Sequence, residues 1–137
     1  LMMKLANNGS VHAKYRRMIT VYVDITAPLY WWKEFDTYKV GTVANSCSTM
    51  HKIHEKEFTL EDFSYEHLLQ KEDLNWGDVC PGSVLESVVY ALNKYRIRYL
   101  KTKNKKYWWQ MIQLLPSSYN QKRTVTMNYE NVINIIH

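Results

Sequence analysis

Hydroxyl and amide side chains are crowded into seven consecutive positions, from Asn45 to His51. Ser46, Ser48 and Thr49 each offer a hydroxyl group, and such groups combine with backbone N–H groups to cradle an anion such as a phosphate. The same side chains also bond to neighbouring backbone groups and cap helices. The pattern therefore predicts either an anion site or a capped helix start at these positions.

A second group of amide side chains lies near the end of the sequence. Asn128 follows Pro116 by twelve residues, and Asn134 follows Asn128 by six. Asn128 precedes an apolar run, so its position is typical of a residue that caps a helix. Its amide would equally serve to hold a ring or a phosphate of a ligand. His12 and Arg17 are further candidates to meet an anion, although a solvated basic face explains them as well.

Metal and nucleophile chemistry have weaker support. His51 and His54 are three residues apart, but two imidazoles without a third ligand make a poor metal site, and we expect no metal. The two cysteines, Cys47 and Cys80, match no metal-ligand or redox spacing. Nothing in the sequence around Cys47 would activate its thiol, so we expect a buried, inert side chain there.

The elements that must position these residues are mostly helices. The clearest helix is predicted over 83–103, with strand-like patterns over 18–26 and 121–127. A short helix is the alternative for residues 18–26. The apolar stripe of that helix comprises Leu85, Val88, Val89, Leu92, Tyr95, Tyr99 and Leu100. The other expected elements are helices over 28–38, 59–69, 105–115 and from Asn128 onward, a loop or helix start over 45–52, and a long loop over 71–82. The sequence thus predicts a helix-dominated α+β domain with one small sheet.

Size and composition limit the number of domains and the kinds of partner that the chain can have. The chain has 137 residues, which is one domain by size, and both of its ends look cut. It contains 11 Tyr and 5 Trp but only 3 Phe, which suits subunit interfaces and pockets for planar ligands as well as a tyrosine-rich core. The net charge of +5 favours anionic partners but is too diffuse to demand a nucleic acid. Because there is no signal peptide and no apolar run long enough to span a membrane, we expect a reduced, cytoplasmic setting and no membrane partner.

The spacing of the first polar segment resembles the central motif of the flavin-dependent thymidylate synthases, the ThyX family. Family members carry an Arg-His-Arg triplet, then seven residues, then a serine. Here Tyr38-Lys39-Val40 stands at the triplet and Ser48 at the serine, with Asn45 at the family's asparagine. Ser46 replaces the family's glutamate, Met50 its arginine, and His51 its tyrosine. The spacing is kept, whereas most of the charge is lost.

The second polar segment resembles the family's C-terminal motif, in which an asparagine opens a helix twelve residues after a proline. Pro116, Asn128 and Asn134 keep that register. Glu130 and Ile112 stand where the family has arginines. With these departures, the resemblance covers the chain from about Gly9 to the end.

This resemblance implies a single ThyX-like domain over residues 1–137, helix-rich with a small, mainly antiparallel sheet. It implies flavin-dependent methylation of dUMP at uracil C5, with FAD as cofactor and with methylenetetrahydrofolate and NADPH as cosubstrates. In this picture Ser46, Ser48 and Thr49 bind the nucleotide, and Lys39, Asn45, His51 and Asn128 bind the cofactor. The family's homotetramers share their sites between subunits, and the aromatic residues Trp31, Trp32, Trp108 and Trp109 would suit such interfaces.

Two alternatives remain open. The missing arginines favour a catalytically silent relative, because each lost cation removes charge-assisted hydrogen bonds to an anion. This relative would be a homo-oligomer that binds a nucleotide without flavin chemistry. A nucleic-acid-binding module that uses the basic, tyrosine-rich surface ranks well below both, and we expect nucleic acid to be an unlikely partner.

Overall fold

The chain folds into two compact units, and its computed structural model describes all residues except 10, 38–40, 47 and 137. Unit 1 comprises Leu1–Thr26, Trp32–Ser46 and Lys122–His137. Unit 2 comprises Ala27–Trp31 and Cys47–Gln121. The chain passes between the units at four points: within the strand β1, within helix α2, after Ser46, and within the strand β3.

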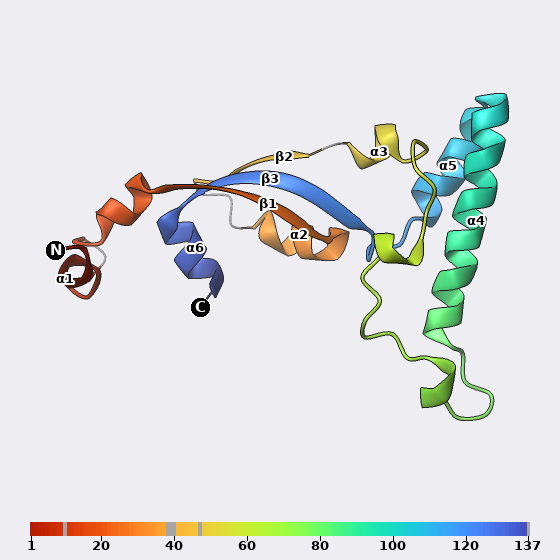
Figure 1. Ribbon diagram of the computed structural model, residues 1–137, viewed down its shortest axis with the longest axis horizontal. Coiled ribbons are helices and arrows are strands. Elements are labelled where there is room, and N and C mark those ends of the chain that lie inside the picture. Colours follow the sequence, from red (N-terminus) through yellow and green to blue (C-terminus); the bar gives the residue numbers. More distant parts are fainter. Residues whose placement is uncertain (10, 38–40, 47, 137) are drawn as a thin grey trace. The chain divides into compact units, whose positions relative to one another are not determined.

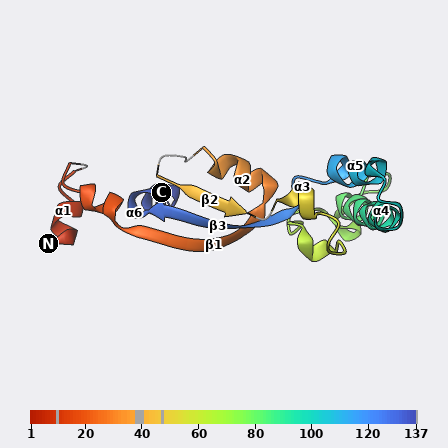
Figure 2. The same ribbon diagram turned by 90° about the horizontal axis from the view of Figure 1, so that it is seen from above.

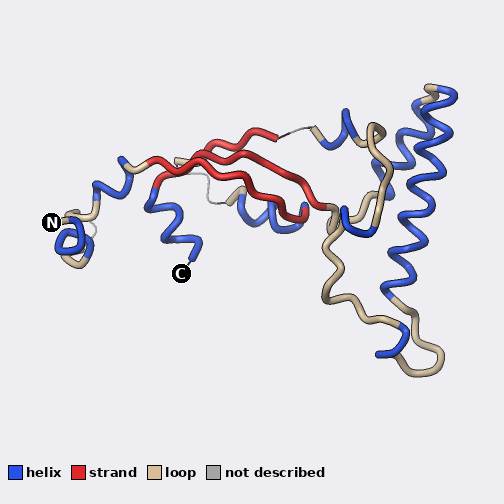
Figure 3. The backbone as a smooth tube through the Cα atoms, viewed as in Figure 1, coloured by secondary structure: helices blue, strands red, loops and turns tan. Residues whose placement is uncertain are grey.

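Most of the sheet belongs to unit 1. Its three strands, β1 (Thr20–Pro28), β2 (Val43–Ser46) and β3 (Asn120–Asn128), lie in the order β1-β3-β2 (Figures 1 and 3). β2 runs antiparallel to β3, with Val43 opposite Thr126 and Ser46 opposite Arg123. β3 contains three consecutive β-branched residues, Thr124, Val125 and Thr126, and its burial alternates: Val125 and Met127 are buried, whereas Thr124 is exposed. The predicted α+β class with a small antiparallel sheet is confirmed.

Helices flank the strands of unit 1. They are α1 (Met2–Ala6), the 3-10 helix η1 (Lys14–Met18), the C-terminal part of α2 (Leu29–Phe35) and α6 (Tyr129–Ile136). Trp32 and Phe35 of α2 are buried and meet edge to face, with ring centroids 5.3 Å apart. The guanidinium of Arg123 lies over the Trp32 ring at 4.4 Å, so α2 covers the face of β3 that carries Arg123.

Unit 2 is built on a hairpin of two helices, α4 (Pro81–Thr102) and α5 (Lys105–Leu114), which lie side by side in Figures 1 and 2. Pro81 is the first residue of α4, where its missing N–H costs nothing. Asn104 caps α5 by accepting a hydrogen bond from the N–H of Lys106 at 3.0 Å. The core of the unit consists of Ile53, Phe58, Phe63, Leu85, Leu92 and Met111.

Shorter elements connect the rest of unit 2 to this hairpin. They are α3 (Thr49–Lys52) and the 3-10 helices η2 (Leu60–Asp62) and η3 (Lys71–Asp73). The side-chain amide of Asn93 on α4 accepts from the N–H of Phe58 at 2.9 Å and donates to its carbonyl at 2.8 Å. Within the described chain, no helix is long and apolar enough to cross a membrane.

Several local predictions were wrong. The helix expected over 59–69 ends after one turn, because Phe63 is extended and forms a β-bridge with Tyr119. Asn45 belongs to β2 rather than to a loop or helix. Trp32, expected at an interface between subunits, is only 1% exposed in the single chain. Leu100 of the predicted apolar stripe is 38% exposed. The remaining predicted helices and strands are present, with ends that differ by a few residues, although α2 ends at Phe35.

Candidate functional site

The segment from Ser48 to His51 forms a capped turn in unit 2. Ser48 is the N-cap of α3, and its hydroxyl accepts a hydrogen bond from the N–H of His51 at 3.5 Å. Thr49 accepts one from the side-chain amide of Gln121 at 2.7 Å. The indole N–H of Trp108 donates to the carbonyl of Met50 at 3.1 Å. The turn is therefore anchored to both α5 and β3, while Ser48 and His51 remain exposed.

Asn45 and Ser46 lie on β2 in unit 1 and are exposed. Residues directly opposite each other on antiparallel strands share a face of the sheet. Asn45 is opposite Thr124 and Ser46 is opposite Arg123, so the two predicted side chains lie on opposite faces. Ser46 shares its face with the cation of Arg123, which is the arrangement that favours a bound anion.

Asn128 begins the last helix, as the cap interpretation predicts. Its side-chain oxygen accepts from the N–H of Asn131 at 3.0 Å, and the side-chain oxygen of Asn131 accepts from the N–H of Asn128 at 3.2 Å. A Cβ built on Gly41 would lie 2.7 Å from Nδ2 of Asn128, so the backbone at Gly41 approaches the amide as closely as a glycine allows. Asn45 pairs with Thr124, four residues from Asn128 along β3, which is about 13 Å on a strand.

Glu130 is held by a cation from the start of the chain. Its carboxylate lies 2.6 Å from Nε of Arg17 and 3.4 Å from a terminal guanidinium nitrogen. This hydrogen bond and the attraction of the carboxylate raise the pKa of Arg17 above its ordinary value. The arginine that sequence analysis offered to an anionic ligand therefore binds a carboxylate of its own unit.

Sequence analysis missed Arg123 as a candidate. Its guanidinium donates to a carboxylate oxygen of Asp36 at 3.0 Å, and only 18% of the side chain is exposed. The signal was present in the sequence, because strand alternation places Arg123 on the same face as the apolar Val125 and Met127. A cation on the apolar face of a strand needs a partner, and the structure supplies Asp36 and Trp32.

The other face of β3 carries a second polar group. Asp24 of β1 accepts a hydrogen bond from the hydroxyl of Thr124 at 2.7 Å and lies 2.9 Å from Nζ of Lys122. Hydrogen bonds from Lys122 and Thr124 hold the pKa of Asp24 below its ordinary value. All three side chains are exposed, so this group stabilises the sheet only weakly.

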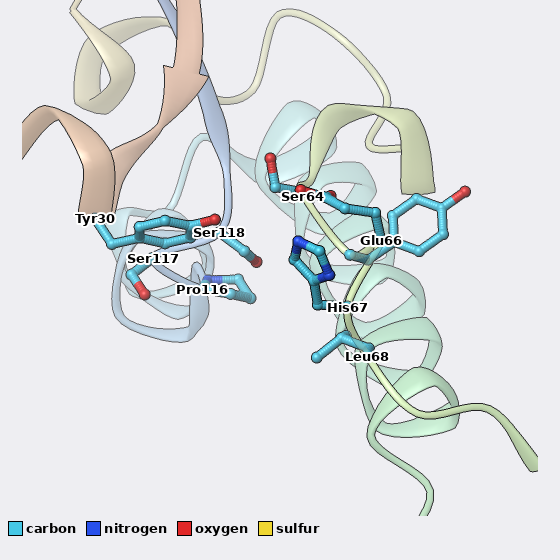
Figure 4. Close-up of a pocket in the computed structure, with 9 residues that line it drawn as sticks. Tyr30, Ser64, Glu66, His67, Leu68, Pro116, Ser117 and Ser118 are labelled. Carbon is cyan, nitrogen blue, oxygen red and sulfur yellow. The ribbon is translucent and has the colours of Figure 1, made fainter. Parts of the chain in front are cut away.

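A cleft of about 230 Å³ opens in unit 2 (Figure 4). In Figure 4 the imidazole of His67 faces Pro116 and Ser118 across this cleft. The N–H of Tyr30 donates to the carbonyl of Ser117 at 3.1 Å, and the N–H of Ser64 donates to that of Ser118 at 2.9 Å. The full lining is Tyr30, Ser64, Tyr65, Glu66, His67, Leu68, Pro116, Ser117 and Ser118. Apart from Pro116, no sequence pattern singled out these residues, because they come from three separate segments.

The remaining predicted sites have simple outcomes. Lys39, the predicted flavin cation, lies outside the described residues, as does Cys47. In the described part of the chain, no group of three or more His, Cys, Asp or Glu side chains is arranged to hold a metal ion. Ser46, Asn45 and Asn128 belong to unit 1, whereas Ser48, Thr49 and His51 belong to unit 2.

The fold is ThyX-like. No protein-family model and no curated protein sequence matches the chain, but solved structures do. A ThyX from Helicobacter pylori with FAD and dUMP matches with a TM-score of 0.65 and 15% identity, over 98% of this chain and 64% of that one. A second H. pylori ThyX structure, complexed with FAD and dUMP, matches with a TM-score of 0.63 and 16% identity, over 97% and 63%. The chain thus spans less than two thirds of the length of either.

A third match widens the chemistry of the neighbours. The UMP/dUMP methylase PolB from Streptomyces cacaoi, bound with 5-Br UMP, matches with a TM-score of 0.56 and 13% identity, over 98% of this chain and 69% of that one. The resemblance to the ThyX family stated from the sequence is therefore confirmed at the level of the fold.

Among the described residues that the sequence predicted to bind a flavin, Asn45 and Asn128 fit a flavin dinucleotide poorly. A pyrophosphate is best held by cations that donate charge-assisted hydrogen bonds. Asn45 and Asn128 supply neutral amides, and Asn128 already caps α6. Glu130 adds a carboxylate that is bound by Arg17. A short turn bearing hydroxyl groups, such as Ser48 and Thr49, is better suited to a single nucleotide phosphate.

Proposed function

We propose that this chain is part of a thymidylate synthase-like protein that binds a pyrimidine nucleotide of the dUMP type. The observation that supports this is the match of nearly the whole chain to three structures whose ligands include dUMP or 5-Br UMP. Ser46, Ser48 and Thr49 are the proposed nucleotide-binding residues. The hydroxyl groups of Ser48 and Thr49 in unit 2, with the backbone N–H groups beside them, would bind the phosphate.

The reaction we propose is methylation of uracil at C5. By family resemblance FAD would supply the redox chemistry, with NADPH and methylenetetrahydrofolate as cosubstrates. Lys39, Asn45, His51 and Asn128 are the residues predicted to bind this cofactor, but Asn45 and Asn128 offer its phosphates only neutral amides. The proposed assembly is a homo-oligomer, a tetramer by family resemblance, in the cytoplasm. Light scattering coupled to size-exclusion chromatography measures that assembly directly.

A second candidate is a relative that binds the nucleotide without flavin chemistry. The specific observation in its favour is the ion pair between Glu130 and Arg17. Glu130 supplies a carboxylate where the family has an arginine, and this carboxylate also binds the guanidinium of Arg17. Flavin phosphates near position 130 would meet a negative charge instead of a positive one, and like charges repel.

The nucleotide proposal is tested by calorimetric titration of the purified protein with dUMP, UMP and dCMP. Replacement of Ser48 by Asp keeps a residue that caps helices well but adds a negative charge beside the proposed phosphate. We expect Ser48→Asp to weaken dUMP binding at least about tenfold, a loss of about 1.4 kcal/mol. The matched control, Ser87→Asp on the exposed face of α4, adds the same charge away from the site. Equal affinities for the two variants would exclude the proposed phosphate site.

The reaction is tested separately by absorbance. Protein incubated with FAD and then desalted should keep the flavin bands if the flavin is bound, and added dUMP should shift them. A folded, colourless protein that still binds dUMP would establish the second candidate. A protein that binds neither ligand would refute both proposals.

A further inference from the structure

The α4–α5 hairpin of unit 2 carries a concentrated positive charge. Between Glu86 and Glu130 the sequence contains no acidic residue. Seven of the chain's 18 Lys and Arg residues lie within 94–106, so the other 11 are outnumbered by 13 carboxylates. The seven cations are Lys94, Arg96, Arg98, Lys101, Lys103, Lys105 and Lys106. The positive net charge of the protein is therefore located in this hairpin.

Six of these seven cations are exposed. The exception is Arg96, which is half-buried and donates to the carbonyl of His54 at 3.0 Å and to that of Glu55 at 3.4 Å. Within the described residues, none of the six exposed cations is in an ion pair. Their charges are thus available to an external anion.

The cations are arranged over aromatic rings. Tyr95 of α4 and Tyr107 of α5 are stacked, with centroids 6.3 Å apart and planes inclined by 25°. The guanidinium of Arg98 lies 5.7 Å from the first ring and 5.9 Å from the second, and Nζ of Lys106 lies 4.9 Å from the second. These contacts hold Arg98 and Lys106 beside the same ring, at the seam between the two helices.

Further contacts of the same kind extend the pattern along α4. Lys94 lies 5.1 Å from the ring of Tyr90, and Lys103 lies 5.6 Å from that of Tyr99. Tyr90 is 65% exposed, and Trp109 on α5 is 45% exposed. Exposed aromatic faces interleaved with cations suit bases and phosphates at the same time.

Helix stability explains only part of this distribution of charge. Lys101 lies in the last turn of α4, where the helix dipole favours a cation, but Lys105 and Lys106 are the first two residues of α5, where the positive end of the dipole disfavours one. Mutual repulsion among six exposed cations adds to that cost. An external polyanion would remove both penalties.

We propose that the α4–α5 hairpin binds single-stranded nucleic acid. The exposed lysines and Arg98 would contact successive phosphates, and Tyr90 and Trp109 would stack on bases. An anionic membrane surface fits less well, because the exposed aromatic groups here are a tyrosine and one tryptophan among charges rather than a continuous apolar face. The sequence alone predicted nucleic acid to be an unlikely partner because the net charge looked too diffuse, whereas the structure shows that one basic group, over 94–106, is exposed beside exposed aromatic rings.

The test is fluorescence anisotropy of a labelled oligo-dT of about 20 nucleotides with the full chain, at salt concentrations from about 50 mM to about 200 mM. The hairpin variant carries Lys103→Gln, Lys105→Gln and Lys106→Gln, since glutamine keeps the helix propensity of lysine. The control variant replaces Lys4, Lys14 and Lys33, which are exposed in unit 1, by Gln and therefore has the same net charge. Far-UV circular dichroism establishes that both variants are folded.

We expect the hairpin variant to lose about three phosphate contacts. The slope of log K against log salt should fall by about 2, and binding at about 0.1 M salt should weaken roughly 100-fold. The control should change affinity less than about threefold. Trp109→Ala should weaken binding about fivefold or more if the indole stacks on a base.

Three results would overturn the proposal. These are equal affinities for the hairpin and control variants, binding that does not depend on salt, and no binding at the lowest salt. Vesicles of phosphatidylcholine and phosphatidylserine serve as a competing probe. Binding to these vesicles without binding to oligo-dT would assign the surface to anionic lipid and reject the nucleic-acid proposal.

Discussion

The contact between Asn93 and Phe58 predicts that an aspartate at position 93 destabilises the protein more at neutral pH than at acidic pH. Both backbone groups of Phe58 bond to the amide of Asn93, at 2.9 Å and 2.8 Å, and the Phe58 side chain is buried in the core of unit 2. An ionised aspartate at position 93 accepts the N–H of Phe58 but cannot donate to its carbonyl. One hydrogen bond is lost and a part-buried carbonyl is left beside a negative charge, so Asn93→Asp should lower the free energy of unfolding by about 2–4 kcal/mol at neutral pH.

Protonation of the new aspartate should reverse most of that loss, because a carboxylic acid donates through its O–H. The folded state therefore favours the protonated form and raises the pKa of Asp at this position above its unfolded value of about 3.9. If the ionised form is about 2–3 kcal/mol less favourable, the folded pKa is about 5.5–6, since each unit corresponds to about 1.4 kcal/mol. The deficit relative to wild type should be smallest below the unfolded pKa and should grow as pH rises through the folded pKa.

Urea unfolding followed by far-UV circular dichroism, from about pH 4 to about pH 8, measures the free energy of unfolding of Asn93→Asp and of the wild type. The signal reports on unit 2, which contains the 22-residue α4 and the 10-residue α5. Gln113→Glu, on the exposed side of α5, makes the same amide-to-acid change without a buried partner and should cost less than about 0.5 kcal/mol at any pH. If Asn93→Asp follows this control, the amide of Asn93 does not hold Phe58.

Three further predictions concern stability and reactivity. Burial raises the pKa of Asp62, but the hydrogen bonds from Lys56 and from the backbone together outweigh it and hold that pKa below its ordinary value. Asp62→Asn should therefore lower the free energy of unfolding by about 1 kcal/mol at neutral pH. In urea unfolding, the stabilities of the variant and the wild type should converge as pH falls below about 4. Hydrogen bonds from the hydroxyl and N–H of Ser83 lower the pKa of Cys80; with the other cysteine replaced by serine, Ser83→Ala should move the pH midpoint of alkylation upward, and an unchanged midpoint would contradict that cause. Leu92 is 0% exposed, so Leu92→Ala should cost about 2–5 kcal/mol in urea unfolding, and a loss below about 1 kcal/mol would mean that the core collapses around the gap.

The parts of the fold that the sequence predicted well are those with local causes. The helix over 83–103 follows from one continuous apolar stripe, and the next helix stops before Pro116 because proline cannot continue it. The strand over 121–127 follows from alternation that matches its burial. In each case the residues that determine the element lie within the element or next to it.

The elements that were missed depend on partners far away in sequence. β2 has only four residues, all exposed, and exists because it pairs with 123–126. Phe63 is extended because it bridges Tyr119, which ends the helix that the capping pattern at Thr59 begins. Tertiary pairing overrides local preference at both places, and a single sequence contains no direct record of it.

In the candidate site, too, features with local causes could be predicted from the sequence and features that depend on distant partners could not. The helix-cap roles of Ser48 and Asn128 follow from local sequence and are present. The pairing of Ser46 with Arg123, which puts a hydroxyl and a cation on one face, depends on the register of β2 against β3. That register could not be predicted from a four-residue strand with no apolar pattern.

The ion pairs of unit 1 limit what the missing arginines mean for anion binding. Arg123 is paired with Asp36, and Arg17 with Glu130. Arg123 is mostly buried, but the guanidinium of Arg17 is exposed, so a phosphate can displace the carboxylate of Glu130 from it at little cost. The pairs therefore weaken anion binding without preventing it. Because Glu130 would stay negatively charged after losing Arg17, its repulsion is the larger obstacle, and Glu130→Gln is the substitution that would most increase affinity for an anion in unit 1.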